Sequence, residues 1–388
     1  MRTIRKVCVV GTGVIGTAVS QAISAREEIE EILILARWEK VVYQINKYHQ
    51  NKIYLPGIKP LSEKIRAAQL DFKKTKNADL IIISSPTSGV KEIIKGIEPD
   101  YQGQPIITLN KGMEARTQFL SHEIIRKEKH LHISGPAIGE ELAKGYFTIN
   151  SIAAFNLDLA RDIGNQIETD NFRLQPTDDL IGVELCGVFK NILAIMMGMA
   201  LGLKLSQNTQ GTLFYEGTRE ARDLLQAFGA KEKTLFSSAW LGDIYLRNIR
   251  NIRFGETFVR EFESGRFNPY ARLFNLLAKW RKRKQKNFVT ELTELYKEIF
   301  VDGFTSGMKD VLSAPIIVSN IINVLLNTAH KEAAEVEGIY SLPSLFKRNK
   351  TLGLRLPIVE ELYKVFTEGQ PSGLAINNIL KAAQAGGK

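Results

Sequence analysis

The sequence is poor in cysteine. Cys8 and Cys186 are the two cysteines among its 388 residues, and each lies in an apolar run. Two thiols cannot form a disulfide framework, which excludes the small secreted domains that depend on one. We expect both thiols to be buried and reduced. The first residues, MRTIRKVCVVG, also lack the apolar core of a signal peptide, so the sequence predicts a cytoplasmic protein.

Long hydrophobic runs are scarce as well. Only the stretch from Leu185 to Leu203 is long enough to cross a bilayer, and no second span accompanies it. Lys190 lies within this stretch, and a lysine at the centre of a membrane span costs about 2.5–3.5 kcal/mol. The sequence therefore predicts a helix buried in protein.

Excess basic charge is absent from most of the chain, although the net charge is +10. Residues 247–286 alone contain twelve Lys or Arg and three Glu, which is nine of the ten excess charges. This distribution is unlike that of a uniformly basic nucleic-acid binder, so no nucleic acid is expected. The run WRKRKQK is typical of a solvated face, with an acidic partner or a membrane surface as alternatives.

Short β-branched runs alternate with helical patterns over the first 175 or so residues, which predicts a mostly parallel sheet. Amphipathic helices are predicted at residues 41–51 and 117–127. After Pro176 the pattern is helical to the end, and Thr177 or Asp178 is the expected N-cap. The predicted strands are residues 4–10, 31–36, 78–85, 105–110, 130–135, 147–155 and 172–176.

A glycine-rich turn joins the first predicted strand to the following helix. Gly11 permits a tight turn, Gly13 lets the backbone approach a pyrophosphate, and Gly16 allows close packing of helix on strand. This context predicts dinucleotide binding at the N-terminus of the helix. We therefore predict an α/β Rossmann domain with a doubly wound sheet at residues 1–177, and an all-α substrate domain at residues 178–388.

The end of the second predicted strand bears on the choice of cofactor. Arg37 and Trp38 follow the strand, and the acidic Glu39 comes one step later. An acidic residue at this end binds the ribose 2′-hydroxyl of NAD, whereas an arginine holds the 2′-phosphate of NADP. NADP is favoured, and use of NAD as well stays open.

Lys190 projects from an unusual face of its helix. At helical spacing this face carries small or apolar residues, at positions 183, 186, 187, 194 and 197. A snorkelling lysine is one explanation. The alternative is a lysine aimed into a cleft between domains, where desolvation lowers its pKa towards neutrality, as a general acid or base requires.

Several motifs resemble those of the NAD(P)-dependent glycerol-3-phosphate dehydrogenase family. IGVELCGVFKNILAI is similar to the Lys-Asn helix of that family, and RNIRFG to its Arg-Asn-Arg-x-Phe-Gly motif. The similarity covers residues 1–255 and 335–380. The other similar segments are NKIYLPG, SSPTSGVKEII, ITLNKGME, SGPAIGEELAKG, NTQGTLFYEGTREARDLLQAFGA, AWLGDIYL and the segment from EVEGIYSLP to EELYKVF.

The resemblance implies reversible hydride transfer between NAD(P)H and dihydroxyacetone phosphate, giving sn-glycerol 3-phosphate for glycerophospholipid synthesis. It implies a C-terminal domain like that of 6-phosphogluconate dehydrogenase, with Lys190 as the base. The implied catalytic residues are Lys190, Lys111 and Asp243. The implied substrate contacts are Lys111, Gly135, Ala137, Lys190, Asp243, Arg250 and Asn251. The implied cofactor contacts are Gly11, Gly13, Val14, Ile15, Gly16, Arg37, Pro86, Lys111, Gly139, Arg250 and Glu337. No metal is expected.

Some positions depart from the family pattern. Ala137 replaces a residue that normally donates a hydrogen bond to the substrate, and Arg247 replaces a threonine in a shortened segment after Asp243. An insert at about residues 256–330 has no counterpart. Two alternatives therefore stay open, a related dehydrogenase acting on a different anionic 2-hydroxy compound and a non-catalytic NADP(H)-binding regulator. A homodimer is a further expectation.

Overall fold

The computed structural model describes residues 2–58, 60–114, 117–246, 252, 255–256, 258–263, 337–368 and 370–385. The chain packs as two compact units. Unit 1 consists of residues 1–190, 218–247 and 337–355, and unit 2 consists of residues 191–217, 248–336 and 356–388. The predicted insert lies almost entirely outside the described residues. The predicted division of the sequence at residues 177 and 178 stays a prediction.

Unit 1 is built on one eight-stranded sheet with the order β3-β2-β1-β4-β5-β6-β7-β8. All neighbouring strands are parallel except β6 and β7, which are antiparallel. The seven predicted strands are present, and β3 is an additional one, at an edge, that the sequence analysis missed. The strands are β1 (Lys6–Val10), β2 (Glu31–Ala36), β3 (Ile65–Gln69), β4 (Leu80–Ile83), β5 (Ile106–Thr108), β6 (His130–Ser134), β7 (Thr148–Ala153) and β8 (Phe172–Thr177).

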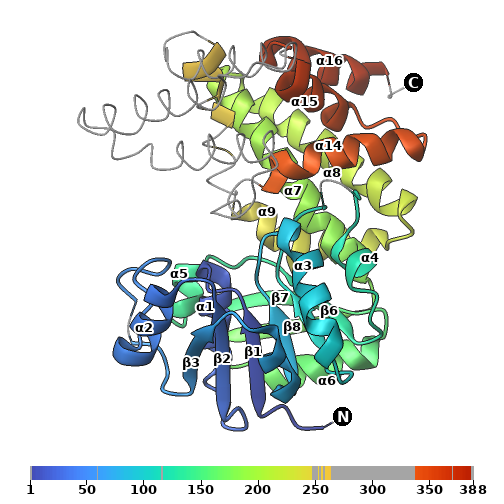
Figure 1. Ribbon diagram of the computed structural model, residues 1–388. Helices are drawn as coiled ribbons and strands as arrows, with labels where there is room; N and C mark the ends of the chain where they lie inside the picture. The colour runs from blue at the N-terminus through green and yellow to red at the C-terminus, as the bar shows by residue number, and fades with distance from the viewer. Residues whose placement is uncertain are drawn as a thin grey trace, which may run out of the picture. The chain divides into compact units, whose positions relative to one another are not determined.

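Helices cover both faces of the sheet, as the doubly wound prediction requires (Figure 1). One face packs against α1 (Val14–Ile23), α2 (Glu39–Tyr48), α5 (Gly139–Ala143) and α6 (Leu157–Ile167). The opposite face packs against α3 (Thr87–Ile97) and α4 (Ser121–Ile125). The helix predicted at residues 117–127 is much shorter, because left-handed residues lie on both sides of it, Gln118 with φ 62° and the C-cap Arg126 with φ 49°.

The long apolar helix α7 (Leu180–Gly202) confirms the predicted core helix. Its length and mean hydropathy of 1.8 would suffice to cross a membrane, but 89% of its most apolar window is buried within the protein. Asp179 is the N-cap, since its Oδ1 accepts the Gly182 N–H at 3.1 Å. The prediction of Thr177 or Asp178 as the N-cap was therefore wrong.

Glycines in the second half of α7 allow close packing inside unit 2. A Cβ at Gly198 would lie 2.0 Å from the carbonyl oxygen of Ile252, and one at Gly202 would lie 2.8 Å from the Val259 side chain. Only glycine permits the backbones to approach this closely. In the same unit, the rings of Phe258 and Phe366 pack with their centroids 5.0 Å apart.

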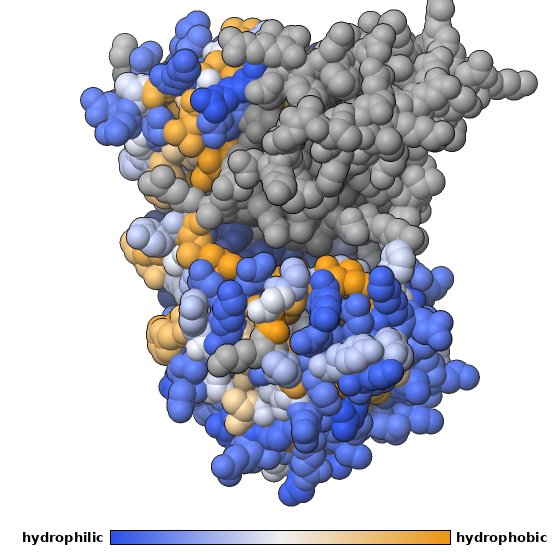
Figure 2. Space-filling view, turned by 90° about the vertical axis from the view of Figure 1, so that its left-hand side faces the viewer, coloured by the Kyte–Doolittle hydropathy of each residue, from blue (hydrophilic) through white to orange (hydrophobic). Residues whose placement is uncertain are grey.

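Figure 2 shows that the sheet-bearing part exposes mainly hydrophilic side chains on the face in view, with hydrophobic residues scattered among them.

The remaining described elements are helical. The longer helices are α8 (Gln207–Ala227), α14 (Glu337–Thr351), α15 (Pro357–Glu368) and α16 (Ser372–Ala385). The shorter turns are α9 (Asp243–Tyr245), the 3₁₀ turns Phe72–Asn77, Glu98–Asp100 and Glu232–Phe236, and the π-helical turns Ser238–Gly242 and Phe258–Glu263.

Candidate active site

The glycine-rich turn has the geometry of a dinucleotide-binding loop. Gly11 directly follows β1 with φ 119°, and a Cβ there would lie 2.1 Å from the Ser84 carbonyl oxygen. A Cβ at Gly16 would lie 2.6 Å from the Gly11 carbonyl oxygen. By contrast, no atom lies within 4 Å of a Cβ built at Gly13, the N-cap of α1. The turn therefore leaves open space at the helix N-terminus, where a pyrophosphate would bind.

Other predicted cofactor residues surround this loop. A Cβ at Gly139 would lie 2.4 Å from Val14 and 3.4 Å from Ile15, so the start of α5 packs on the start of α1. Pro86 is the N-cap of α3. Arg37 lies at the end of β2, and its guanidinium is 3.8 Å from the Glu92 carboxylate. The arrangement can hold a dinucleotide along the carboxyl ends of β1, β2 and β4.

Lys111, Lys190 and Asp243 meet in unit 1. Oδ2 of Asp243 accepts a hydrogen bond from Lys111 Nζ at 2.7 Å and forms a short ion pair with Lys190 Nζ. Lys190 and Asp243 are each 5% exposed. Lys111 Nζ also donates to the carbonyl oxygen of Gly135 at 3.3 Å. The structure thus brings together residues that are 53 to 132 positions apart in the sequence.

The small residues on α7 explain how Lys111 reaches this position. A Cβ at Gly187 would lie 3.4 Å from Lys111 Cγ and 3.5 Å from Ser134 Oγ, so the lysine stem passes close to the helix backbone. Asp243 is placed by the preceding π-helical turn. There the Trp240 ring stacks on Phe189 of α7, with the centroids 6.3 Å apart.

The charges in this cluster shift one another's pKa values. Burial lowers the pKa of Lys190 to about 7; the charge of Asp243 opposes this shift, and that of Lys111 adds to it. Burial alone would raise the pKa of Asp243, but the two ammonium groups outweigh burial and hold the pKa below its ordinary value. Lys190 can therefore exchange a proton near neutral pH, beside a carboxylate that stays ionised.

Some predicted residues lie elsewhere or outside the described part of the chain. Ala137 lines a cavity of about 310 Å³, together with Pro136, Ile138, Thr148 and Leu246 among others. Arg250 and Asn251 fall outside the described residues, as does the side chain of Glu337, the first residue of α14. Their predicted contacts stay predictions.

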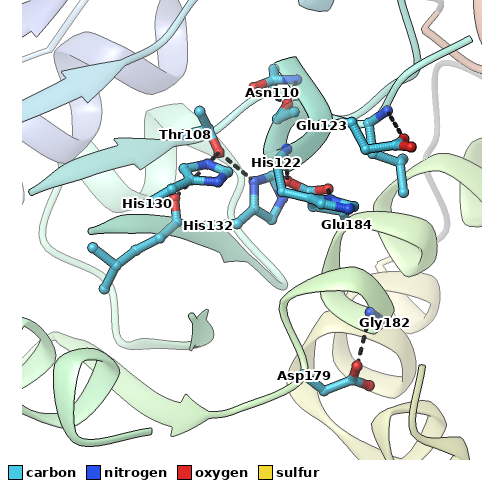
Figure 3. Close-up of polar contacts among 12 residues, drawn as sticks. Thr108, Asn110, His122, Glu123, His130, His132, Asp179, Gly182 and Glu184 are labelled. Carbon is cyan, nitrogen blue, oxygen red and sulfur yellow. Dashed lines mark hydrogen bonds and ion pairs between the residues drawn. The ribbon is translucent and has the colours of Figure 1, made fainter. Parts of the chain in front are cut away.

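A second polar cluster was missed in the sequence analysis. Figure 3 shows His122 facing Glu184, and Thr108 lying between His130 and His132. Burial lowers the pKa of His132 to about 3, so its imidazole is neutral. Glu184 carried a usable signal, since it is a second charged residue on the apolar helix that carries Lys190.

Both cysteines are buried, as predicted, and burial raises the pKa of Cys8 to about 12. Within the described ranges, no group of three or more His, Cys, Asp or Glu side chains is placed to hold a metal ion.

Comparison with known proteins agrees with this geometry. The N-terminal model of NAD-dependent glycerol-3-phosphate dehydrogenase matches residues 6–160, and the C-terminal model matches residues 179–271. The chain belongs to this family. The predicted family, fold class and dependence on NAD or NADP are thereby confirmed, and the protein is an NAD(P)-dependent oxidoreductase acting on a CH–OH group.

Individual proteins of this family are moderately similar to this chain in sequence. A glycerol-3-phosphate dehydrogenase of Polynucleobacter asymbioticus is 30% identical over 280 residues, which are 68% of this chain and 82% of that protein. One from Parvibaculum lavamentivorans is 32% identical over 247 residues, 62% and 73% of the two chains. The crystal structure of the Coxiella burnetii enzyme has the same fold, with a TM-score of 0.73 at 23% identity over 97% of this chain and 99% of that one.

Proposed function

We propose that the protein reversibly transfers a hydride between NAD(P)H and dihydroxyacetone phosphate, with sn-glycerol 3-phosphate as the reduced product. The observation that carries this proposal is the buried Lys190 beside Asp243, in a chain of this family. A ketone reduction needs one proton at the carbonyl oxygen, and an ammonium whose pKa lies near 7 can supply it. When bound, the nicotinamide supplies or accepts the hydride.

The three clustered side chains divide the remaining work. Lys190 gives a proton to the C2 oxygen during reduction and takes it back during oxidation. Lys111 holds positive charge beside that oxygen, which stabilises the charge that develops on it. Asp243 keeps both ammonium groups in place and orients the substrate hydroxyls. Arg250 and Asn251 hold the substrate phosphate.

The cofactor is proposed to lie over the glycine-rich loop. Gly11, Gly13 and Gly16 admit the pyrophosphate, and Arg37 binds the 2′-phosphate of NADP. The exposed guanidinium of Arg37 supports a preference for NADP, with NAD as a second cofactor.

We also propose the metabolic role of the enzyme and its place in the cell. sn-Glycerol 3-phosphate is the backbone of glycerophospholipids, so we place the reaction in lipid synthesis in the cytoplasm. A homodimer and a contact of the basic insert with an acidic partner or a membrane surface are further proposals. No nucleic-acid partner and no metal are expected.

Ala137 supports a second candidate substrate. Its methyl group cannot donate a hydrogen bond, and it lines a cavity with Pro136 and Leu246. A different anionic 2-hydroxy compound is therefore the second candidate substrate. A panel of 2-keto and 2-hydroxy compounds distinguishes the two, because turnover of another ketone without turnover of dihydroxyacetone phosphate would contradict the main proposal.

A further inference from the structure

The short helix α4 contacts three different parts of unit 1. Ser121 Oγ accepts a hydrogen bond from the Asn110 amide at 2.8 Å. His122 contacts Glu184 on α7, and Glu123 contacts Arg348 on α14. Three consecutive residues of one helix turn therefore hold the segment that precedes Lys111, the helix that carries Lys190, and a helix more than 200 residues later in the sequence.

The contact with α7 is a buried ion pair. Glu184 Oε1 accepts the His122 backbone N–H at 3.0 Å, and Oε2 lies 2.6 Å from His122 Nδ1. Burial pushes the pKa of His122 down, but the hydrogen bond and charge of Glu184 outweigh it and raise the pKa overall. Burial raises the pKa of Glu184 as well, so both shifts keep the shared proton on the pair. Glu184 lies six residues before Lys190 on the same helix.

The contact with α14 is a bidentate ion pair. The Arg348 guanidinium donates to both Glu123 oxygens, at 2.6 and 2.8 Å, and to the Gln118 carbonyl oxygen at 2.9 Å. It also lies over the Phe228 ring, 4.5 Å from the centroid. Because its donors are aimed at two sites of the same segment, Arg348 fixes residues 118–123 more firmly than a single ammonium would.

The segment between Lys111 and α4 has further contacts with α14. Ser341 Oγ accepts the Met113 N–H at 3.1 Å, and this serine is 1% exposed. On the other side of Lys111, the Asn110 amide donates to Thr87 Oγ1 at 3.0 Å as well as to Ser121. The backbone that carries Lys111 is thus held immediately before and two residues after the lysine.

We propose that α4, Glu184 and Arg348 form a brace that sets the position of Lys111 relative to Lys190, and that Arg348 is a positioning residue for the proton transfer. One end of the brace is on the helix of Lys190, through Glu184. The other end is on the segment of Lys111, through the hydrogen bond between Ser121 and Asn110. Arg348 holds α4 and the residues before it through Gln118 and Glu123. This inference rests on the proposed function for the meaning of the lysine pair.

Loosening the brace has a specific consequence for Lys190. Lys111 is one of the charges that lower the pKa of Lys190, and it shares Asp243 with it. If Lys111 moves away, this repulsion weakens and Asp243 pairs with Lys190 alone. Both changes favour the ammonium, so the Lys190 pKa rises. A purely structural role of Arg348 would not produce this shift.

The test compares Arg348→Met with Lys347→Met, an exposed lysine of the same helix, in the full chain. The Lys190 titration is followed by NMR of [¹³Cε]lysine-labelled protein, with the signal assigned by its loss in Lys190→Met. In Arg348→Met we expect the Lys190 pKa to rise by at least about half a pH unit. We expect kcat for dihydroxyacetone phosphate to fall about 10- to 100-fold, with the Kd of NADPH changed by less than about threefold and Lys347→Met unchanged.

A second variant covers the case in which Arg348→Met fails to fold. Glu123→Gln keeps an acceptor for the Leu120 N–H, which Glu123 Oε2 binds at 2.9 Å, and removes the charge facing Arg348. It should shift the Lys190 titration in the same direction. An unchanged Lys190 titration in the folded variant would overturn the brace, whether or not kcat falls. If the wild type fails to reduce dihydroxyacetone phosphate, the proposed function fails, while the Lys190 titration still tests the brace.

Discussion

Lys111 Nζ lies 2.7 Å from Oδ2 of Asp243, the oxygen that also pairs with Lys190. Two ammonium groups therefore share one buried carboxylate oxygen. The repulsion between the two ammonium groups has a cost in free energy, because the charge of each lysine opposes protonation of the other. The carboxylate acts against this effect, since it favours protonation of both lysines. The arrangement makes proton exchange at Lys190 possible near neutral pH, and the following predictions test this account.

Replacing Lys190 by methionine removes the proton donor and keeps most of the side-chain volume. We expect kcat to fall by about 10²–10⁴-fold with little change in the Kd of NADPH. Steady-state rates and fluorescence titration with NADPH measure the two quantities. Near-normal turnover would show that another group transfers the proton.

The two directions of the reaction should respond oppositely to pH. Reduction of the ketone needs protonated Lys190, so its rate falls as the pH rises through about 7. Oxidation of the alcohol needs neutral Lys190, so its rate rises over the same range. Initial rates in both directions, with saturating substrates, check the sign. A limb of the same sign in both directions would exclude Lys190 as the titrating group.

Asp243→Asn should destabilise the fold by about 3 kcal/mol, because it leaves the buried Lys190 ammonium and the half-buried Lys111 ammonium without their carboxylate. The loss is larger below pH 7, where Lys190 is protonated, and smaller above it, where Lys190 is neutral. Denaturant unfolding at both pH values measures it. Asp178→Asn is the control, since Asp178 pairs with Lys231 near the surface and should cost at most about 1 kcal/mol. Equal losses of stability in Asp243→Asn and Asp178→Asn would argue against a buried charge cluster at Asp243.

Two glycines of the first turn should respond differently to alanine. Gly16→Ala would bring a Cβ within 2.6 Å of backbone, so we expect a loss of stability of about 1–3 kcal/mol. Gly13→Ala meets no atom within 4 Å and has φ −61°, so the fold should be unaffected. Its methyl group would instead obstruct the pyrophosphate and raise the Kd of NADPH. Unchanged NADPH binding in Gly13→Ala would place the cofactor elsewhere.

Arg37 and Glu92 should set the balance between the two cofactors. Arg37→Ala should weaken NADPH more than NADH, because only NADPH carries the 2′-phosphate. Glu92→Gln should strengthen NADPH binding, because the carboxylate 3.8 Å from Arg37 competes with the phosphate. The ratio of the two Kd values in each variant is the measurement. Equal effects on both cofactors would make Arg37 an ordinary surface residue.

The fold was largely predictable because its signals are local. Buried parallel strands such as Leu80–Ile83 are continuous β-branched or apolar runs, and the glycine-rich turn has fixed spacing. The edge strand Ile65–Gln69 carries an arginine, two alanines and a glutamine, so its sequence has no such run. It becomes a strand through pairing with β2, which no local pattern reveals.

The site was predictable only in part. The helical face identified Lys190 as unusual, and the family resemblance assigned its partners Lys111 and Asp243. The distances that join them depend on packing between distant segments, as do the contacts of Glu184 with His122 and of Arg348 with Glu123. Glu184 stands out because it lies on an apolar helix. The other three side chains are of types common on surfaces, so their sequence positions gave no sign that they pair inside the fold.

The most direct test of the account is the absorbance of NADPH in the presence of purified protein and dihydroxyacetone phosphate, with NADH compared in parallel. We predict that NADPH is consumed, that sn-glycerol 3-phosphate accumulates in equal amount, and that Lys190→Met slows both by about 10²–10⁴-fold. Binding of NADPH without its consumption in the presence of dihydroxyacetone phosphate would contradict the account, whether or not the protein reduces another 2-keto compound.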